Sequence, residues 1–151
     1  MQTSDDTLIE SLRQWRAAGK SAALATVVST WGSSPRPEGS HLAVDGDGHF
    51  LGSVSGGCIE GAVIEAAMQS MQGGQPRLLE FGVSDEQAWQ VGLACGGRVQ
   101  VYVAAVGKGA TLDRIAAAMA AREPLVVVTR LGDGAQCMVD AQGCSGDFSL
   151  S

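Results

Sequence analysis

The stretch S-V-S-G-G-C-I-E-G-A-V-I-E-A-A-M, residues 53–68, decides the fold that we expect for this chain of 151 residues. An apolar run that is typical of a strand ends at Val54, and the glycine pair at 56–57 predicts a tight turn behind it. A helix then begins near Cys58, because the apolar residues that follow recur at helical spacing, and the glycine pair at 73–74 ends it. The stretch is therefore a strand–turn–helix unit.

Upstream of this unit the sequence predicts a helix, a strand and a hairpin. The hairpin signal is the turn sequence Asp45-Gly46-Asp47-Gly48, which stands between two short apolar runs. The expected elements are a helix over 7–18, a buried strand over 22–30, a loop over 31–39 and strands over 41–44 and 50–54.

Downstream, strands and helices alternate. The expected elements are strands over 77–83, 99–106 and 125–131 (the last one buried), a short helix from Ser84, a helix over 112–121 and a weak hairpin partner around Met138. This order predicts an α/β or α+β fold: a mixed β-sheet with an early hairpin, covered by helices. We expect one domain over 1–151.

Composition and charge exclude several classes of function. The formal net charge is −6 and no run of Lys or Arg occurs, which disfavours both nucleic-acid binding and docking on anionic lipid. No stretch of about 18 apolar residues is present, so a membrane span is not expected. The polar N-terminus lacks the apolar core of a signal peptide, which predicts a cytoplasmic protein. An anionic ligand must therefore be held by a local site that works against the overall charge.

The four cysteines are expected to be thiols, metal ligands or reactive groups rather than disulfides, as is usual in the cytoplasm. None occurs in a C-x-x-C pair, so neither a zinc ribbon nor a thioredoxin-type motif is supported. Cys137 and Cys144 lie beside weakly patterned sequence, and we expect plain thiols there. His41 and His49 lie on the predicted hairpin strands without a second metal-type ligand recurring nearby, so we interpret them as surface or core residues.

The proline-rich segment 32–39, G-S-S-P-R-P-E-G, is the first candidate for binding chemistry. The hydroxyls of Ser33 and Ser34 and the guanidinium of Arg36 lie among stiff prolines, just after a buried strand. Hydroxyls, backbone N–H groups and a planar cation are groups that bind phosphate. An ordinary proline-rich connection with a solvent-exposed arginine explains the same residues, so both interpretations stay open.

Two further segments each place a cysteine beside a glycine pair. In residues 53–61 it is Cys58, and a helix N-terminus there would favour an anion and lower the pKa of the thiol. In residues 92–98, G-L-A-C-G-G-R, it is Cys95. In a sheet-based domain both turns can lie on one edge and build a thiol site. A small buried cysteine at position 58, and chance repetition in a chain with 21 glycines, are the competing explanations.

Together these segments resemble the XdhC/CoxI family of xanthine dehydrogenase accessory proteins. The matching stretches are G-S-S-P-R-P-E-G at 32–39, L-G-S-V-S-G-G-C-I-E-G at 51–61, F-G-V-S-D-E-Q-A-W-Q-V-G-L-A-C-G-G at 81–97 and the R-V-Q-V-Y-V that follows. They come in the family's order and together are specific, whereas one alone would be weak. Longer members continue into a second domain of Rossmann type, and we expect this chain to correspond to the N-terminal domain only.

The resemblance implies a chaperone, rather than an enzyme, that binds the molybdenum cofactor and helps deliver it to a xanthine dehydrogenase or related hydroxylase. The implied cargo is a phosphorylated pterin, molybdopterin, with a dithiolene-bound metal, and Cys58 and Cys95 are the candidate metal contacts through its molybdenum. The candidate cofactor contacts are Ser33, Ser34, Arg36, Ser55, Gly56, Gly57, Cys58, Cys95, Gly96 and Gly97. The expected partners are the apo-hydroxylase, a cysteine desulfurase, a Rossmann-domain protein and further copies of this chain.

Two other functions stay open at this point. A thiol enzyme would relay sulfur through Cys58 or Cys95; it requires a base or cation near the thiolate, and Arg36 and Arg98 are the nearby candidates. A non-catalytic assembly module would instead bridge a partner protein through the same loops.

Overall fold

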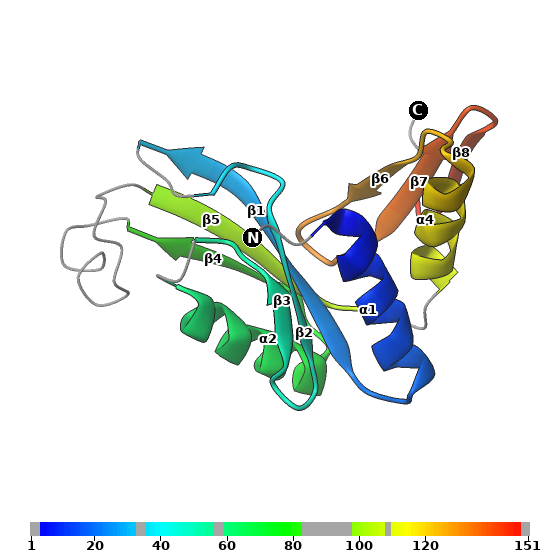
Figure 1. The fold of residues 1–151 in the computed structure, drawn as a ribbon. Helices are drawn as coiled ribbons and strands as arrows, with labels where there is room; N and C mark the ends of the chain where they lie inside the picture. The colour runs from blue at the N-terminus through cyan, green and yellow to red at the C-terminus, as the bar shows by residue number, and fades with distance from the viewer. Residues whose placement is uncertain (1–3, 33–35, 56–58, 83–97, 108–109, 149–151) are drawn as a thin grey trace.

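The computed structural model describes residues 4–32, 36–55, 59–82, 98–107 and 110–148 (Figure 1). They form an α+β arrangement with a five-stranded and a three-stranded sheet, which confirms the fold class. The helices are α1 (Asp5–Ala17), α2 (Glu60–Gly73) and α4 (Ala110–Ala121). The strands are β1 (Ala22–Trp31), β2 (His41–Asp45), β3 (Phe50–Gly52), β4 (Arg77–Phe81), β5 (Arg98–Ala105), β6 (Val126–Thr129), β7 (Gln136–Asp140) and β8 (Gly143–Gly146).

Local signals determine where α1 begins and ends, close to the bounds that its apolar spacing predicts. Ser4 caps the helix, since its side-chain oxygen accepts a hydrogen bond from the Thr7 amide at 3.2 Å. Leu8 and Leu12 are its buried residues, four positions apart and therefore on one face. Gly19 follows at a φ of +82°, a left-handed conformation that glycine adopts readily, and the chain then enters β1.

β1 is the central strand of the five-stranded sheet, whose order is β3-β2-β1-β5-β4. Its first half pairs with β2, from Ala22 opposite Asp45 to Thr26 opposite His41. Its whole length pairs with β5 up to Trp31, which lies opposite Arg98, with a register shift between Val27 and Ser29. The second half of β1 therefore extends beyond the β2–β3 hairpin.

The sequence predicted a mixed sheet, whereas each described pairing is antiparallel. The reason is the position of the strands that a helix connects. α2 joins β3 to β4, and these two strands lie at opposite edges of the sheet rather than side by side. The crossover therefore creates no parallel pair, and the strands between the two edges alternate in direction.

The two faces of this sheet have different cover. Strand residues of one face, including Val27, Val44 and Val101, form the main core. They pack with Ile59, directly before α2, and with Val63 on α2. Each fully buried side chain of this kind contributes roughly 1.5–3 kcal/mol. The opposite face packs in part against α1, which Figure 1 shows on the side of the sheet away from α2.

The C-terminal strands form a separate antiparallel sheet of order β6-β7-β8. The prediction of a buried strand over 125–131 is wrong in its burial: β6 is an edge strand, and Val126 at its start is 58% exposed. β8 was not predicted, because the sequence Gly143-Cys144-Ser145-Gly146 carries no strand propensity of its own. It forms because β7 offers it a partner.

Candidate functional site

The strand register brings the ends of two candidate segments together at one end of the five-stranded sheet. β1 ends at Trp31 directly before the 32–39 segment, and Trp31 lies opposite Arg98, the last residue of the 92–98 segment. β4 ends at Phe81, which lies opposite Val99 near the start of β5. The chain therefore leaves the sheet at the end of β4 beside the place where it re-enters at β5. The described flanks of both segments are therefore neighbours.

The third candidate segment starts part-way along β1, level with Ala25, from a strand that runs toward the same end. β3 runs in the same direction as β1 because both pair antiparallel with β2 between them. Directly after β3, the Ser53 amide donates a hydrogen bond to the His41 carbonyl at 3.0 Å. The 53–61 segment therefore leaves the sheet on the side toward which β1 points. The convergence of the glycine-flanked turns stays a prediction, because positions 56–58 and 92–97 lie outside the described residues.

Glu60, the first residue of α2, holds the beginning of this third segment in place. Its Oε2 accepts hydrogen bonds from the Val54 amide at 3.0 Å, the Ser55 amide at 2.9 Å and the Ser53 hydroxyl at 3.3 Å. Its Oε1 accepts one from the Ser55 hydroxyl at 2.5 Å. One carboxylate thus binds four donors on three consecutive residues, as an anion-binding turn would.

Ser55 completes the connection between the two ends of the segment. Its hydroxyl donates to Glu60 and accepts a hydrogen bond from the Ile59 amide at 2.9 Å, and the residue is only 2% exposed. Residues on both sides of positions 56–58 are therefore tied to one carboxylate. The spacing of Ser55 and Glu60, five positions apart, did not reveal this contact in the sequence, because it depends on how the chain turns back.

The described part of the proline-rich segment folds back along the second half of β1. The Gly39 amide donates to the Val27 carbonyl at 2.8 Å, and the Val27 amide donates to the Ser40 carbonyl at 2.9 Å. The Thr30 amide donates to the Glu38 side chain at 3.3 Å. Arg36, just before this return, is half-buried, with its Nε atom enclosed by protein. Whether Arg36 faces Cys58 stays a prediction.

Three side chains form a row across β1, β5 and β4 at this end of the sheet. The Arg98 guanidinium carbon lies 5.0 Å from the ring centroid of Trp31, and Arg98 Nη2 lies 3.4 Å from Glu80 Oε1. Trp31 nevertheless remains 45% exposed. Sequence reasoning missed Trp31 and Glu80, because only the register shows that they flank Arg98. An exposed aromatic ring beside a paired cation offers a surface for a planar ligand.

Most of the proposed contact residues lie outside the described residues, as does the short helix predicted from Ser84. These contact residues are Ser33, Ser34, Gly56, Gly57, Cys58, Cys95, Gly96 and Gly97. The predicted proximity of Cys58 to a helix N-terminus also falls there; the described helix α2 begins at Glu60.

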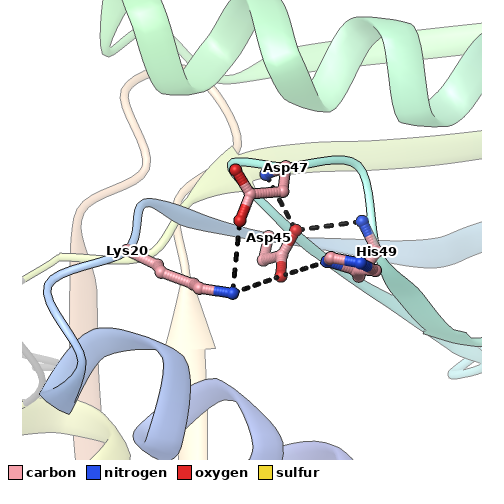
Figure 2. Close-up of polar contacts among 4 residues, drawn as sticks. All are labelled: Lys20, Asp45, Asp47 and His49. Carbon is pink, nitrogen blue, oxygen red and sulfur yellow. Dashed lines mark hydrogen bonds and ion pairs between the residues drawn. The ribbon is translucent and has the colours of Figure 1, made fainter.

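A second polar cluster lies on the hairpin turn at the other end of β1 (Figure 2). Asp45, with its side chain 1% exposed, accepts hydrogen bonds from the Asp47 amide and the His49 amide at 2.9 Å each. Its other oxygen lies 3.0 Å from His49 Nδ1 and 3.6 Å from Lys20 Nζ. Lys20 Nζ also lies 3.2 Å from the Asp47 carboxylate.

His49 is a surface residue, as expected, with its side chain 71% exposed, but two metal-type ligands do lie beside it, contrary to the expectation from the sequence. The ligand atoms of Asp45, Asp47 and His49 lie within 4.8 Å of one another. The Lys20 ammonium already supplies the positive charge between the carboxylates, so we interpret the cluster as a latch that fixes the hairpin turn. Burial alone would raise the pKa of Asp45, but hydrogen bonds from the His49 amide and ring and from the Asp47 amide outweigh it and lower the pKa.

The expectation of plain thiols at Cys137 and Cys144 is wrong, because the two are joined by a disulfide. Cys137 lies on β7 and Cys144 on β8, and the register places Cys144 opposite Val139, two residues from Cys137. Their Cα atoms are 6.5 Å apart, within the range that a disulfide spans. The sequence concealed this proximity because β8 has no signal from which the hairpin register could be predicted.

Comparison with known proteins gives these features a context. The sequence profile of the XdhC and CoxI family matches residues 15–82. The molybdenum cofactor insertion chaperone PaoD of Escherichia coli (strain K12) is 37% identical over 83 residues, which are 54% of this chain and 26% of that protein. The uncharacterized protein YqeB of the same organism is 35% identical over 85 residues, 56% of this chain and 16% of that protein.

A solved structure shares the fold. It is described as a xanthine dehydrogenase from Bacillus halodurans, and it superposes with a TM-score of 0.80 at 24% identity, over 99% of this chain and 46% of that chain. The present chain thus spans less than a third of either curated relative and less than half of the solved chain. None of the described helices is long and apolar enough to cross a membrane.

Proposed function

We propose, from the membership of residues 15–82 in the XdhC and CoxI family, that this chain binds the molybdenum cofactor as cargo and helps transfer it to a molybdenum hydroxylase. The observation that carries the proposal is that the 32–39 segment leaves β1 beside the point where the 92–98 segment enters β5, because Trp31 lies opposite Arg98, while β3 runs toward the same end of the sheet. The relative PaoD, a molybdenum cofactor insertion chaperone, supports the same cargo.

The cofactor offers two chemically different groups to such a site. Its phosphate requires hydrogen-bond donors and positive charge, which we assign to Arg36, Ser33, Ser34 and the glycine-rich turns. Its metal and sulfur atoms are soft and suit thiol ligands, which we assign to Cys58 and Cys95. No step of this assignment requires the chain to catalyse a reaction.

We assign Ser55 and Glu60 to positioning rather than to direct contact with the cofactor. The Ser55 hydroxyl is buried and already lies between the Ile59 amide and the Glu60 carboxylate. Glu60 holds the three residues that precede the glycine pair at 56–57. Glu60 is half-buried, and the four hydrogen bonds that its carboxylate accepts stabilise its negative charge. We therefore assign Glu60 to holding the residues that lead into the turn.

An anaerobic titration of the protein with molybdenum cofactor tests the proposal. Cys58→Ser, Cys95→Ser and Arg36→Ala should each weaken binding, and the loss of one charge-assisted phosphate contact corresponds to roughly tenfold in Kd. Arg77→Ala is the matched control for Arg36, because Arg77 is exposed at the start of β4, away from this end of the sheet.

Equal affinity of the Arg36→Ala and Arg77→Ala variants would reject the phosphate role of Arg36. If neither single substitution of Cys58 or Cys95 changes cofactor retention, the thiol contacts are rejected. Transfer is then measured by reconstitution of an apo-hydroxylase with the loaded protein. Delivery is contradicted if the loaded protein gives no more hydroxylase activity than free cofactor does.

The sulfur-relay alternative gains no support from the described residues. It needs a cation close to the thiolate, but the Arg98 guanidinium is already shared between Glu80 and the ring of Trp31. Mass spectrometry of the native protein separates the two functions, since a persistent persulfide on Cys58 or Cys95 belongs to the relay and bound pterin belongs to the chaperone.

A further inference from the structure

A hollow separates the five-stranded sheet from the C-terminal sheet, on the face that α2 does not cover. It has a larger lobe of about 470 Å³ and a smaller lobe of about 400 Å³. The two lobes share a wall formed by Ile9, Leu24, Thr26, Ile115, Thr129 and Gln136. We call this space the α1–α4 hollow, because both helices line both of its lobes. It uses none of the loops assigned to the cofactor.

The hollow is partly open to solvent, and its size suits a small molecule. Each lobe lies in the range of 300–1,000 Å³ that is typical of small-molecule sites. Three of the six residues of its shared wall, Ile9, Leu24 and Ile115, are aliphatic, and the other three are polar.

Tyr102 marks a specific contact within the smaller lobe. The residue lines this lobe and is 5% exposed, and its hydroxyl has no hydrogen-bond partner among the described residues. A Cβ atom added to Gly134, which lines the same lobe, would lie 3.3 Å from that hydroxyl. A buried hydroxyl without a partner costs roughly 1–3 kcal/mol, and a ligand acceptor that reaches it after a shift of the adjacent Gly134 turn would recover that cost. Burial first, and Asp133 second, raise the pKa of Tyr102, so the phenol stays a donor at neutral pH.

The charges around the hollow restrict the ligand. Asp5, Glu123 and Asp147 contribute carboxylates to its walls, whereas Arg122 contributes a single guanidinium. His41 lines the larger lobe, and burial lowers its pKa, so its ring is neutral at pH 7. This balance repels a phosphate or carboxylate, and the aliphatic wall disfavours any unpaired charge.

We propose that the α1–α4 hollow is a second ligand site, which takes a neutral, mostly apolar small molecule bearing one hydrogen-bond acceptor for the Tyr102 hydroxyl. The inference is independent of the proposed function, because that cargo is a phosphorylated anion and its assigned contacts lie on other segments. The polar residues of the shared wall already have partners, since the Thr26 hydroxyl lies 3.0 Å from His41 Nδ1 and the Gln136 amide donates to the Thr129 hydroxyl at 3.1 Å.

The test is an NMR titration of the ¹⁵N-labelled protein with three bicyclic probes. 1-Indanone carries an acceptor, indane lacks it, and indane-1-carboxylate adds a negative charge. We expect 1-indanone to shift the amide resonances of Thr26, Thr129 and Gln136 in a saturable way, and the carboxylate to shift them less. Absence of saturable shifts for both neutral probes overturns the proposal.

Two substitutions locate the site. Tyr102→Phe should weaken 1-indanone about fivefold, the value of one neutral hydrogen bond, and leave indane unchanged. Ile115→Phe, at the junction of the lobes, should weaken both probes, whereas Val126→Phe, an equivalent enlargement at an exposed position, should weaken neither. If all three variants bind 1-indanone as the unaltered protein does, the probe lies elsewhere and the site is rejected. Tyr102→Phe loses no described hydrogen bond, so its melting temperature serves as the check on folding.

Discussion

Replacing Glu60 by glutamine should destabilise the protein by about 2 kcal/mol although the side chain keeps its size. Hydrogen bonds to a carboxylate contribute about 1.5–3 kcal/mol, and neutral ones about 0.5–1.5, so each of the three donors on Oε2 loses about 1 kcal/mol. The helix dipole adds roughly 0.3–1 kcal/mol, because Glu60 lies in the first turn of α2. Partial exposure of the carboxylate reduces the sum to about 2 kcal/mol.

Urea unfolding followed by circular dichroism measures this loss, and a thermal scan should show a melting temperature lower by roughly 4–8 °C. Glu65→Gln is the matched control, since Glu65 lies exposed on the same helix and its loss should stay within about 0.5 kcal/mol. Cofactor binding by Glu60→Gln should fall further than the unfolded fraction explains. The reasoning is refuted if the two glutamine variants unfold at the same urea concentration.

Two further outcomes follow from the described contacts. Burial lowers the pKa of His41 below its usual 6.5, so as the pH falls the unfolded chain takes up a proton before the folded chain does. The free energy of unfolding should therefore fall as the pH drops below about 6.5. Urea titrations at pH 7.5, 6.0 and 5.0 measure this slope, and His41→Gln should remove it. Because Cys137 and Cys144 form a disulfide, thiol titration in denaturant should detect two more thiols after reduction than before it, and an unchanged count would contradict the bond.

The sequence was most informative where one short segment determines its own structure. The apolar spacing of α1, the β-branched run of β1 and the Asp-Gly turns of the β2–β3 hairpin all act over a few residues, and each element formed close to its predicted bounds. The separate C-terminal sheet was not predicted, because periodicity shows that a strand exists but not which strand it pairs with. The antiparallel order has the same origin, since β3 and β4 were free in principle to lie side by side.

In the candidate site, too, local sequence features were predictable and contacts between distant residues were not. Glycine pairs and cysteines are visible in the sequence because their residue types are unusual there, and that they share one site stays a prediction. Trp31 and Glu80 became part of it only through their cross-strand register with Arg98. Glu60 was visible as a residue close to the turn, but its four hydrogen bonds depend on a backbone path that no spacing rule describes.

The length of β1 has a consequence for how this protein tolerates change. The strand runs from Ala22, beside the Asp45 latch, to Trp31, beside the flanks of the 32–39 and 92–98 loops, and nine residue steps of about 3.3 Å separate the two ends by roughly 30 Å. Substitutions more than about 10 Å apart without shared partners have additive effects on stability. The loops can therefore diverge in sequence, or be redesigned, without epistasis from the latch, and improvements to the latch provide a stability reserve for costly changes in the loops.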